Sequence, residues 1–319
     1  ALASDYSEFI AVYGRRRVGK TFLIRETFNY RFTFQHTGMA NTTSKNQLVN
    51  FRDSLIEQGA TKVPKLNNWL EAFSELKRFL NVSTDERKLV FIDELPWLDT
   101  PKSDFLSALE HFWNGWATSR KDIVLVVCGS ATSWIVEKII NNHGGLHNRL
   151  TKRIKLNPFT LKECESFIES KHISMNRYQI VEAYMVLGGI PYYWSFLKKG
   201  LSVAQNIDRL FFQESGELQN EFDMLYASLF RFPEGYVKIV TALGGKKVGM
   251  SSKEIIDSTL IADSGTLTRM LKELEWCGFI RKYNNIGKTS KEAIFQLIDN
   301  YTLFYFQFIQ KNHLMDEHF

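Results

Sequence analysis

The sequence predicts an α/β fold in which helices cover both faces of a parallel β-sheet. Over the first half of the 319-residue chain, short apolar segments alternate with longer segments whose hydrophobic residues recur at helical spacing. The short segments are apolar at consecutive positions, which is typical of parallel strands buried on both faces. Hydrophobic residues form 44% of the chain and aromatic residues 14%, so we expect substantial cores and exclude general disorder.

The expected strands and helices follow one another regularly through this first half. The expected strands are Phe9–Tyr13, Arg31–His36, Lys88–Ile92, Ile123–Cys128 and a fifth that begins in Arg153–Leu156. The expected helices are Lys20–Phe28, Lys45–Gln58, Trp69–Leu80 and Ser103–Ser119. Together these elements define a predicted core domain over residues 1–157.

Strand patterns disappear after Pro158, and the sequence then predicts a helical lid over residues 158–232. The expected lid helices are Leu161–Lys171, Asn176–Leu187, Pro191–Leu197 and Ser202–Phe212. A third pattern follows Pro233, with helices expected at Tyr236–Leu243, Ser251–Ser258 and Ser264–Cys277 and strands at Phe279–Tyr283 and Ala293–Ile298. Three helices followed by a β-hairpin indicate a winged helix-turn-helix domain over residues 233–319, with a trailing aromatic helix.

Charge and cysteine content give only weak indications of the binding partner and the cellular compartment. The chain carries 40 Lys and Arg against 35 Asp and Glu, a net charge of +5, which permits an anionic partner without requiring one. Its three cysteines, Cys128, Cys164 and Cys277, lie far apart and form no CxxC pair, which favours a reducing cytoplasm. The apolar runs are too short for a membrane-spanning helix.

A complete phosphate-binding motif follows the first expected strand. Residues 14–21 read Gly-Arg-Arg-Arg-Val-Gly-Lys-Thr, which matches G-x-x-x-x-G-K-[ST] between a strand and a helix. Backbone amides of such a loop and the helix N-terminus attract an anion, the lysine reaches the β- and γ-phosphates, and the threonine hydroxyl ligates Mg²⁺. The residues predicted to bind nucleotide here are Gly14, Arg15, Arg16, Arg17, Val18, Gly19, Lys20, Thr21 and Phe22. Each of the three arginines either is a solvated loop residue, or contacts phosphate, or closes on another domain.

Two carboxylates end the third expected strand and complete the predicted site. Asp93 is expected to hold the Mg²⁺ together with Thr21, because parallel strands deliver their carboxyl ends to the ligand crevice. Glu94 is the predicted catalytic base that orients the attacking water, with helix capping as its alternative role. Ser130, after the next strand, either contacts the γ-phosphate or the water, or caps a turn. Arg149 either stabilises transition-state charge or is an ordinary surface arginine.

These residues together resemble a known group of proteins. GRRRVGKT, LVFIDELPWL, CGSATSW, HNRLTKRIKLNPF and the Gly188–Tyr193 segment are similar to the prokaryotic P-loop ATPases abundant in Archaea, of the STAND branch near AAA+ proteins. The resemblance implies that Pro191 lies in the lid and touches the nucleotide base or sugar. It also implies a C-terminal nuclease-like domain, of which we expect none in this chain.

Three functions remain open from the sequence. The leading hypothesis is an ATP-hydrolysing, Mg²⁺-dependent switch that moves the winged helix; the absence of an Asn-Lys-x-Asp stretch favours ATP over GTP. The second is a nucleotide-regulated DNA-binding protein, and the third is an interaction scaffold that does not hydrolyse nucleotide. The basic residues that would contact DNA are Arg269, Lys272, Lys288 and Lys291. Because Glu273 and Glu275 make the charge of the expected recognition helix mixed, the alternative is that the winged helix is an interaction or regulatory module packed on the ATPase.

Overall fold

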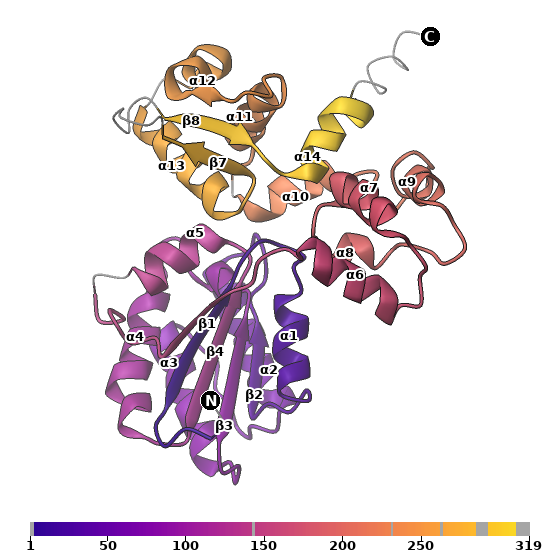
Figure 1. The fold of residues 1–319 in the computed structure, drawn as a ribbon. Helices are drawn as coiled ribbons and strands as arrows, with labels where there is room; N and C mark the ends of the chain where they lie inside the picture. Colours follow the sequence, from indigo (N-terminus) through magenta and orange to yellow (C-terminus); the bar gives the residue numbers. More distant parts are fainter. Residues whose placement is uncertain (1–2, 142–143, 231, 262–263, 285–292, 311–319) are drawn as a thin grey trace. The chain divides into compact units, whose positions relative to one another are not determined.

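The chain divides into two compact units in the computed structural model (Figure 1). The structure describes residues 3–141, 144–230, 232–261, 264–284 and 293–310. The first unit comprises residues 1–14 and 20–156, and the second comprises residues 15–19 and 157–319. The five residues of the turn at 15–19 therefore pack with the second unit, whereas the strand before them and the helix after them belong to the first.

The first unit is built on a five-stranded parallel sheet (Figure 1). Its strands are β1 (Glu8–Tyr13), β2 (Phe34–Thr37), β3 (Lys88–Asp93), β4 (Ile123–Gly129) and β5 (Lys152–Lys155). They lie in the order β2-β3-β4-β1-β5, and every neighbouring pair is parallel. The strand that precedes Ser130 therefore lies between β1 and β3, the two strands that carry the sequence motifs.

Both faces of this sheet are buried, as the continuous apolar strands predict. On one face Ile10 and Val12 of β1 pack with Ile24 of α1 (Lys20–Thr27). On the other, Phe9 and Ala11 join a larger core with helices α2 (Ser44–Glu57), α3 (Trp69–Val82) and α4 (Phe105–Gly115). Alternate residues of one strand thus serve opposite cores, which is the pattern expected for a sheet covered on both sides.

The helix expected over Ser103–Ser119 is shorter in the structure. The α-helix α4 ends at Gly115, where Trp116 leaves helical geometry with φ −142° and ψ −53°, and a 3-10 turn, η2 (Ala117–Ser119), follows. Two further helical segments lie beyond the strands and were absent from the sequence-based expectation. They are the 3-10 turn η1 (Leu95–Leu98) after β3 and the pair α5 (Thr132–Trp134) and η3 (Ile135–Ile140) after β4.

The second unit begins with a group of helices. They are α6 (Leu161–Ser170), α7 (Arg177–Leu187), α8 (Pro191–Trp194), α9 (Val203–Phe211) and α10 (Glu221–Leu229). Helices α6, α7 and α9 each begin with a capping box, in which a side chain at the N-cap and one three residues later satisfy exposed amides reciprocally. Helix α10 was not predicted; its first turn carries Glu221, which is almost completely buried.

The rest of the second unit combines helices with a small antiparallel sheet. The helices are α11 (Glu234–Gly244), α12 (Ser252–Thr259), α13 (Ser264–Trp276), α14 (Asn300–Phe304) and the π-helical turn η5 (Tyr305–Ile309). The strands β6 (Met250–Ser251), β7 (Ile280–Tyr283) and β8 (Ile294–Leu297) lie in the order β6-β8-β7. The expected pair of strands is thus present, with β6 as an addition. The separation of a lid from a winged helix at residue 232 stays a prediction.

Aromatic residues of α14 lie inside the second unit. Tyr301 is fully buried and packs against Tyr193 of α8 and Phe211 of α9, with ring centroids 5.4 and 6.0 Å away. Phe308, in the following turn η5, is 46% exposed.

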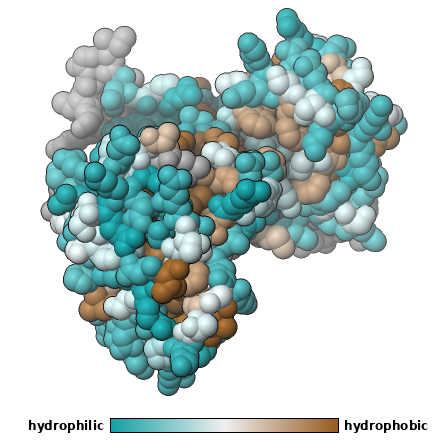
Figure 2. Space-filling view, turned by 90° about the horizontal axis from the view of Figure 1, so that it is seen from below, coloured by the Kyte–Doolittle hydropathy of each residue, from teal (hydrophilic) through white to brown (hydrophobic). Residues whose placement is uncertain are grey.

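The face drawn in Figure 2 is mostly hydrophilic, and its hydrophobic residues are gathered in a few places. Within the described part of the chain, no helix has the length and apolar character needed to cross a bilayer.

Candidate phosphate and magnesium site

Thr21 and Asp93 meet at the carboxyl ends of the strands of the first unit. Thr21 is the second residue of α1, and Asp93 is the last residue of β3. The Thr21 hydroxyl donates a hydrogen bond of 2.7 Å to Oδ2 of Asp93, whose other oxygen accepts from the Glu94 amide at 2.9 Å. Asp93 is only 5% exposed. A hydroxyl and a carboxylate are thus held side by side, with their oxygens oriented by the backbone.

Gly14 starts the turn between β1 and α1 in a conformation that only glycine adopts easily. Its φ is +146°, and a Cβ atom there would lie 2.2 Å from the carbonyl oxygen of Leu156. Leu156 is held at this place because its amide donates a 2.8 Å hydrogen bond to the Tyr13 carbonyl. Gly19, at the other end of the turn, has φ +88°. Positive φ at both glycines lets the backbone curl, which the phosphate-binding motif requires.

Glu94 and Ser130 lie together beside Asp93. The Ser130 hydroxyl is 3.1 and 3.0 Å from the two carboxylate oxygens of Glu94, and the Ser130 amide donates to the same carboxylate at 3.2 Å. Glu94 has φ +47°, a left-handed conformation that is uncommon for a residue with a side chain and that concentrates at functional sites. Both residues follow adjacent strands, so the sheet itself brings this carboxylate to the edge where Thr21 lies.

Lys20 and Cys128 complete the buried part of this edge. Lys20 is the first residue of α1 and is 6% exposed. Cys128 is fully buried in β4; burial raises the pKa of its thiol well above the usual value, and the nearby Asp93 carboxylate raises it further. Cys128 is therefore a neutral packing residue at physiological pH and supplies no thiolate to the site.

Two of the three loop arginines are bound by carboxylates of the second unit. Arg15 forms an ion pair with Asp299 and lies over the ring of Phe279, 4.4 Å from its centroid. Arg17 forms an ion pair with Glu221, at the start of α10, and lies over the ring of Tyr192 at the same distance. The sequence contained the Tyr192 segment among its motifs, but no local signal identified Asp299 or Glu221.

The other residues predicted to contact nucleotide or DNA differ in burial and position. Val18 is buried, Arg16 is half-buried, and Phe22 is 65% exposed on α1. Pro191 is the first residue of α8, next to the Tyr192 ring that lies under Arg17. Arg269 and Lys272 are exposed on α13, where Lys272 lies over the ring of Trp276, whereas Lys288 and Lys291 fall outside the described residues.

Arg149 lies at the opposite edge of the sheet from the phosphate loop, and its role in stabilising transition-state charge stays a prediction. It is exposed and precedes β5, whose parallel pairing with β1 begins near the N-terminal end of both strands. The Thr151 amide donates to the Phe9 carbonyl, so Arg149 is level with the start of β1, roughly 20 Å along the strand from the phosphate loop. The structure therefore does not bring Arg149 to Glu94 and Ser130 of the same chain.

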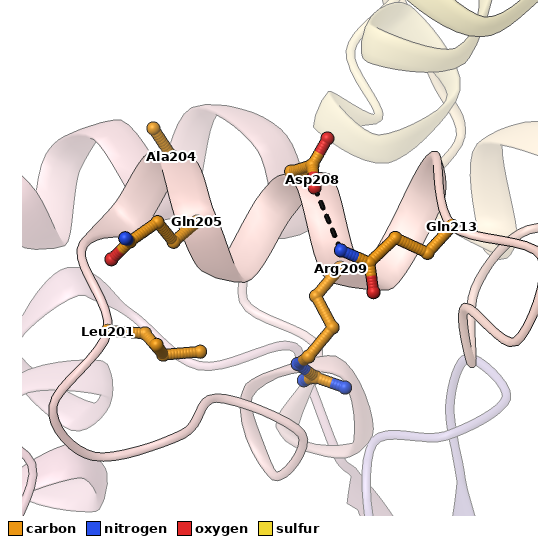
Figure 3. Close-up of a pocket in the computed structure, with 6 residues that line it drawn as sticks. All are labelled: Leu201, Ala204, Gln205, Asp208, Arg209 and Gln213. Carbon is orange, nitrogen blue, oxygen red and sulfur yellow. Dashed lines mark hydrogen bonds between the residues drawn. The ribbon is translucent and has the colours of Figure 1, made fainter.

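A separate pocket of about 470 Å³ lies along α9 in the second unit (Figure 3). Its lining residues are Leu201, Ala204, Gln205, Asp208, Arg209 and Gln213. The Gln213 amide donates to the Asp208 carboxylate at 3.0 Å, and Arg209 is paired with Glu217 at 2.7 Å and donates to the Phe196 carbonyl. The Arg209 guanidinium in this pocket is thus already bound by protein groups. The residues that line the pocket include no glycine-rich turn like that of residues 14–19.

The conformation of the β1–α1 turn and the carboxylates at the end of β3 agree with a family match. A model of an ATPase domain found predominantly in Archaea matches residues 1–197, more than half of the chain. The chain belongs to this ATPase family. The matched residues include every part of the site described above that lies in the first unit.

Solved structures have a similar fold, and a curated protein has a similar sequence. The Walker-type ATPase paby2304 of Pyrococcus abyssi aligns over 94% of this chain and 91% of its own, with TM-score 0.65 and 17% identity. The Aeropyrum pernix ORC2 protein, solved with ADPNP and ADP, aligns over 98% and 89%, with TM-score 0.57 and 14% identity. The uncharacterized protein MJECL04 of Methanocaldococcus jannaschii is 27% identical over 313 residues; these are 98% of this chain but 66% of that relative.

The donor atoms of the site suit Mg²⁺. Mg²⁺ prefers oxygen ligands, and in phosphate-binding proteins it is held by one or two side chains together with substrate phosphates and water. The Thr21 hydroxyl and the Asp93 carboxylate form such a pair. No group of three or more His, Cys, Asp or Glu able to hold a metal occurs within the described ranges, so the protein offers no alternative cage of that kind there.

Proposed function

We propose that this ATPase-family chain binds ATP with Mg²⁺ and hydrolyses it at the site formed by the phosphate loop and the ends of β3 and β4. The observation that carries the proposal is the 2.7 Å hydrogen bond between Thr21 and Asp93, with Glu94 and Ser130 beside it. A phosphate loop alone would support nucleotide binding, whereas an adjacent second carboxylate supports hydrolysis as well.

Each side chain has a separate role in this proposal. Lys20 neutralises the β- and γ-phosphates from the first turn of α1, where the amides of the helix N-terminus also point toward an anion. Glu94 accepts a hydrogen bond from the attacking water and so orients a lone pair of the water oxygen toward the γ-phosphorus. Ser130 holds the Glu94 carboxylate in position until that water binds. Thr21 and Asp93 are the residues that would hold Mg²⁺, which would offset the negative charge of the phosphates.

Two variants separate hydrolysis from binding alone. Lys20→Ala should abolish nucleotide binding and turnover, because the ammonium group that neutralises the phosphates is removed. Glu94→Gln should bind ATP and retain it unhydrolysed, because the amide cannot act as a base. If the parent chain binds ATP but shows no Mg²⁺-dependent phosphate release, the protein is a non-hydrolysing scaffold and the proposed activity is wrong.

The same proposal includes a conformational output through the C-terminal part of the second unit. Helices α11, α12 and α13 with the antiparallel strands β6, β7 and β8 support the predicted winged helix, whose position would depend on the nucleotide. Limited proteolysis in ATP analogue and in ADP tests this coupling. Different cleavage patterns within residues 233–319 support a switch, and identical patterns in both nucleotides contradict it.

A second candidate function is nucleotide-regulated DNA binding. It is favoured by the exposure of Arg269 and Lys272 on α13, the helix that would be the recognition helix of the predicted winged helix. The same helix carries Glu273 and Glu275, so its charge is mixed. Phosphate contacts make DNA binding strongly salt-dependent. Loss of a low-salt mobility shift in Arg269→Ala with Lys288→Ala supports this function, and no shift at low salt excludes it.

A further inference from the structure

Two arginines of the phosphate loop, Arg15 and Arg17, form ion pairs with carboxylates that are almost completely buried. Arg15 is 5% exposed, between the Asp299 carboxylate and the Phe279 ring. Burial alone would lower the pKa of Arg15, but the charge of Asp299 outweighs it and the pKa is raised, so the guanidinium stays charged. Removing one partner of such a buried pair would leave the other charge uncompensated, which is strongly destabilising.

Asp299 is itself fixed by two further hydrogen bonds. It is the N-cap of α14, and its Oδ2 accepts from the Thr302 amide at 3.0 Å and from the Thr302 hydroxyl at 2.6 Å. Its Oδ1 is the atom that meets Arg15. One carboxylate therefore caps α14 and pairs with Arg15 at the same time.

Arg17 is held in an equivalent way by a different helix. Glu221 is 2% exposed; one of its oxygens pairs with Arg17, and the other accepts a 2.6 Å hydrogen bond from the Tyr193 hydroxyl. The Tyr192 ring lies under the guanidinium. Arg17 has φ +68°, a conformation that disfavours any residue with a Cβ and persists only where surrounding contacts impose it. Its partners supply those contacts.

Arg16, between the two anchors, provides the contrast. Among the residues that the structure describes it has no ion pair, and its side chain is half-buried. The loop therefore has two arginines in ion pairs with buried carboxylates, and a third, Arg16, whose charge acts on Glu221 without forming an ion pair. Attraction of phosphate, one of the roles that the sequence allowed for each arginine, does not account for the two buried carboxylates.

We propose that Asp299 and Glu221 are positioning residues of the phosphate loop, which hold it through Arg15 and Arg17 in the curled conformation that receives phosphate. This inference rests on the proposed nucleotide binding. The two arginines act as anchors and not as phosphate ligands, because moving them to phosphate would leave two buried carboxylates unpaired. A loop fixed beforehand loses less conformational freedom when a nucleotide binds, so the anchors strengthen binding.

Equilibrium titration with a fluorescent ADP analogue and Mg²⁺ tests the pair at Arg17. We expect Arg17→Ala and Glu221→Gln each to raise Kd at least tenfold, and the double variant to be no weaker than the weaker single variant. Arg16→Ala removes the same loop charge without an anchor and should raise Kd less than threefold. Asp223→Asn removes an exposed carboxylate from the same helix and should leave Kd within twofold of the parent value. Arg17→Lys keeps the ion pair and should recover most of the affinity.

The outcomes separate this inference from the proposed function. If Glu221→Gln tightens binding or leaves it unchanged while Arg17→Ala weakens it, Arg17 is a phosphate ligand and the positioning role is wrong. Equal losses in Arg16→Ala and Arg17→Ala also overturn it. If the parent chain binds no nucleotide, the proposed function fails and the positioning role fails with it. Circular dichroism of each variant identifies losses of affinity that are caused by misfolding. If an alanine variant is misfolded, the Kd values of Arg17→Lys and Arg16→Lys are compared instead.

Discussion

The hydroxyl of Thr21 donates a 2.7 Å hydrogen bond to the carboxylate of Asp93, although 72 positions separate the two residues. The contact exists because β1 and β3 are parallel and β4 lies between them, so both strands end at the same edge of the sheet. The oxygens of the two side chains face one another there, at the place where a phosphate-bound Mg²⁺ would need them.

Replacement of either oxygen should change the requirement for Mg²⁺. In Thr21→Ala we expect the Mg²⁺ concentration for half-maximal ATP turnover to rise at least about tenfold, because a ligand is lost. Titration of MgCl₂ at fixed ATP measures this. Thr27→Ala, on the exposed side of the same helix, is the matched control and should leave the titration unchanged. Equal Mg²⁺ dependence in both variants would contradict the assignment of Thr21.

Glu94→Gln should reduce turnover by about 10²–10⁴-fold, the usual contribution of a general base, while nucleotide affinity stays near the parent value. Ser130→Ala should have a smaller effect, about tenfold, because Glu94 keeps its charge and the Ser130 amide remains its partner. Single-turnover phosphate release with bound ATP measures both. A larger loss in Ser130→Ala than in Glu94→Gln would reverse the two roles.

Gly14→Ala should destabilise the first unit by about 3 kcal/mol or more, because the new Cβ would lie 2.2 Å from the Leu156 carbonyl at a strained φ. Gly59→Ala is the matched control. Gly59 has φ +101° but nothing lies within 4 Å of its Cβ position, so only backbone strain of about 1 kcal/mol is expected. Urea unfolding of both variants gives the difference. If both variants lose a similar amount of unfolding free energy, the close approach to Leu156 does not contribute to the destabilisation.

His36 should make the stability of the first unit depend on pH. It is 2% exposed in β2, and burial lowers its pKa to about 3. Between pH 6.5 and 3 the unfolded chain binds a proton that the folded chain does not. Stability is therefore complete above pH 6.5 and falls with decreasing pH, by up to about 1.4 kcal/mol per pH unit.

His36→Phe should make this dependence shallower. The replacement keeps an aromatic ring beside Phe51, and Ser54, which now pairs with the imidazole, retains its hydrogen bond to the Asn50 carbonyl. The free energy of unfolding is measured in urea at pH 7, 6 and 5 for both proteins. An unchanged slope in the variant would mean that other groups dominate the pH dependence.

The sequence predicted the elements that depend on local pattern. The phosphate loop lies where its motif places it, between a strand and a helix, and the apolar run before Asp93 is the buried strand β3. The position of Arg149 follows from the same rule that places Asp93. A residue that precedes a parallel strand lies at the edge of the sheet opposite the ligand, whereas a residue that ends one lies at the ligand edge.

Other features could not be predicted from the sequence alone. Glu221 and Asp299 follow the loop by about 200 and 280 positions, and each also belongs to a helix start, where acidic residues are common for local reasons. The ion pairs with Arg15 and Arg17 arise from the tertiary packing of the second unit. The hydrophobic periodicity of the sequence predicts helices and strands but not such packing. Helix α10, in contrast, was missed although its buried residues Phe222, Leu225, Tyr226 and Leu229 recur at helical spacing.

Isothermal titration calorimetry of the parent chain with ADP and Mg²⁺, beside Lys20→Ala, tests the central claim most directly. We predict saturable binding of one nucleotide by the parent chain and no measurable heat of binding in Lys20→Ala, with both proteins folded. No binding by the parent chain, or equal binding by the two proteins, would contradict the account.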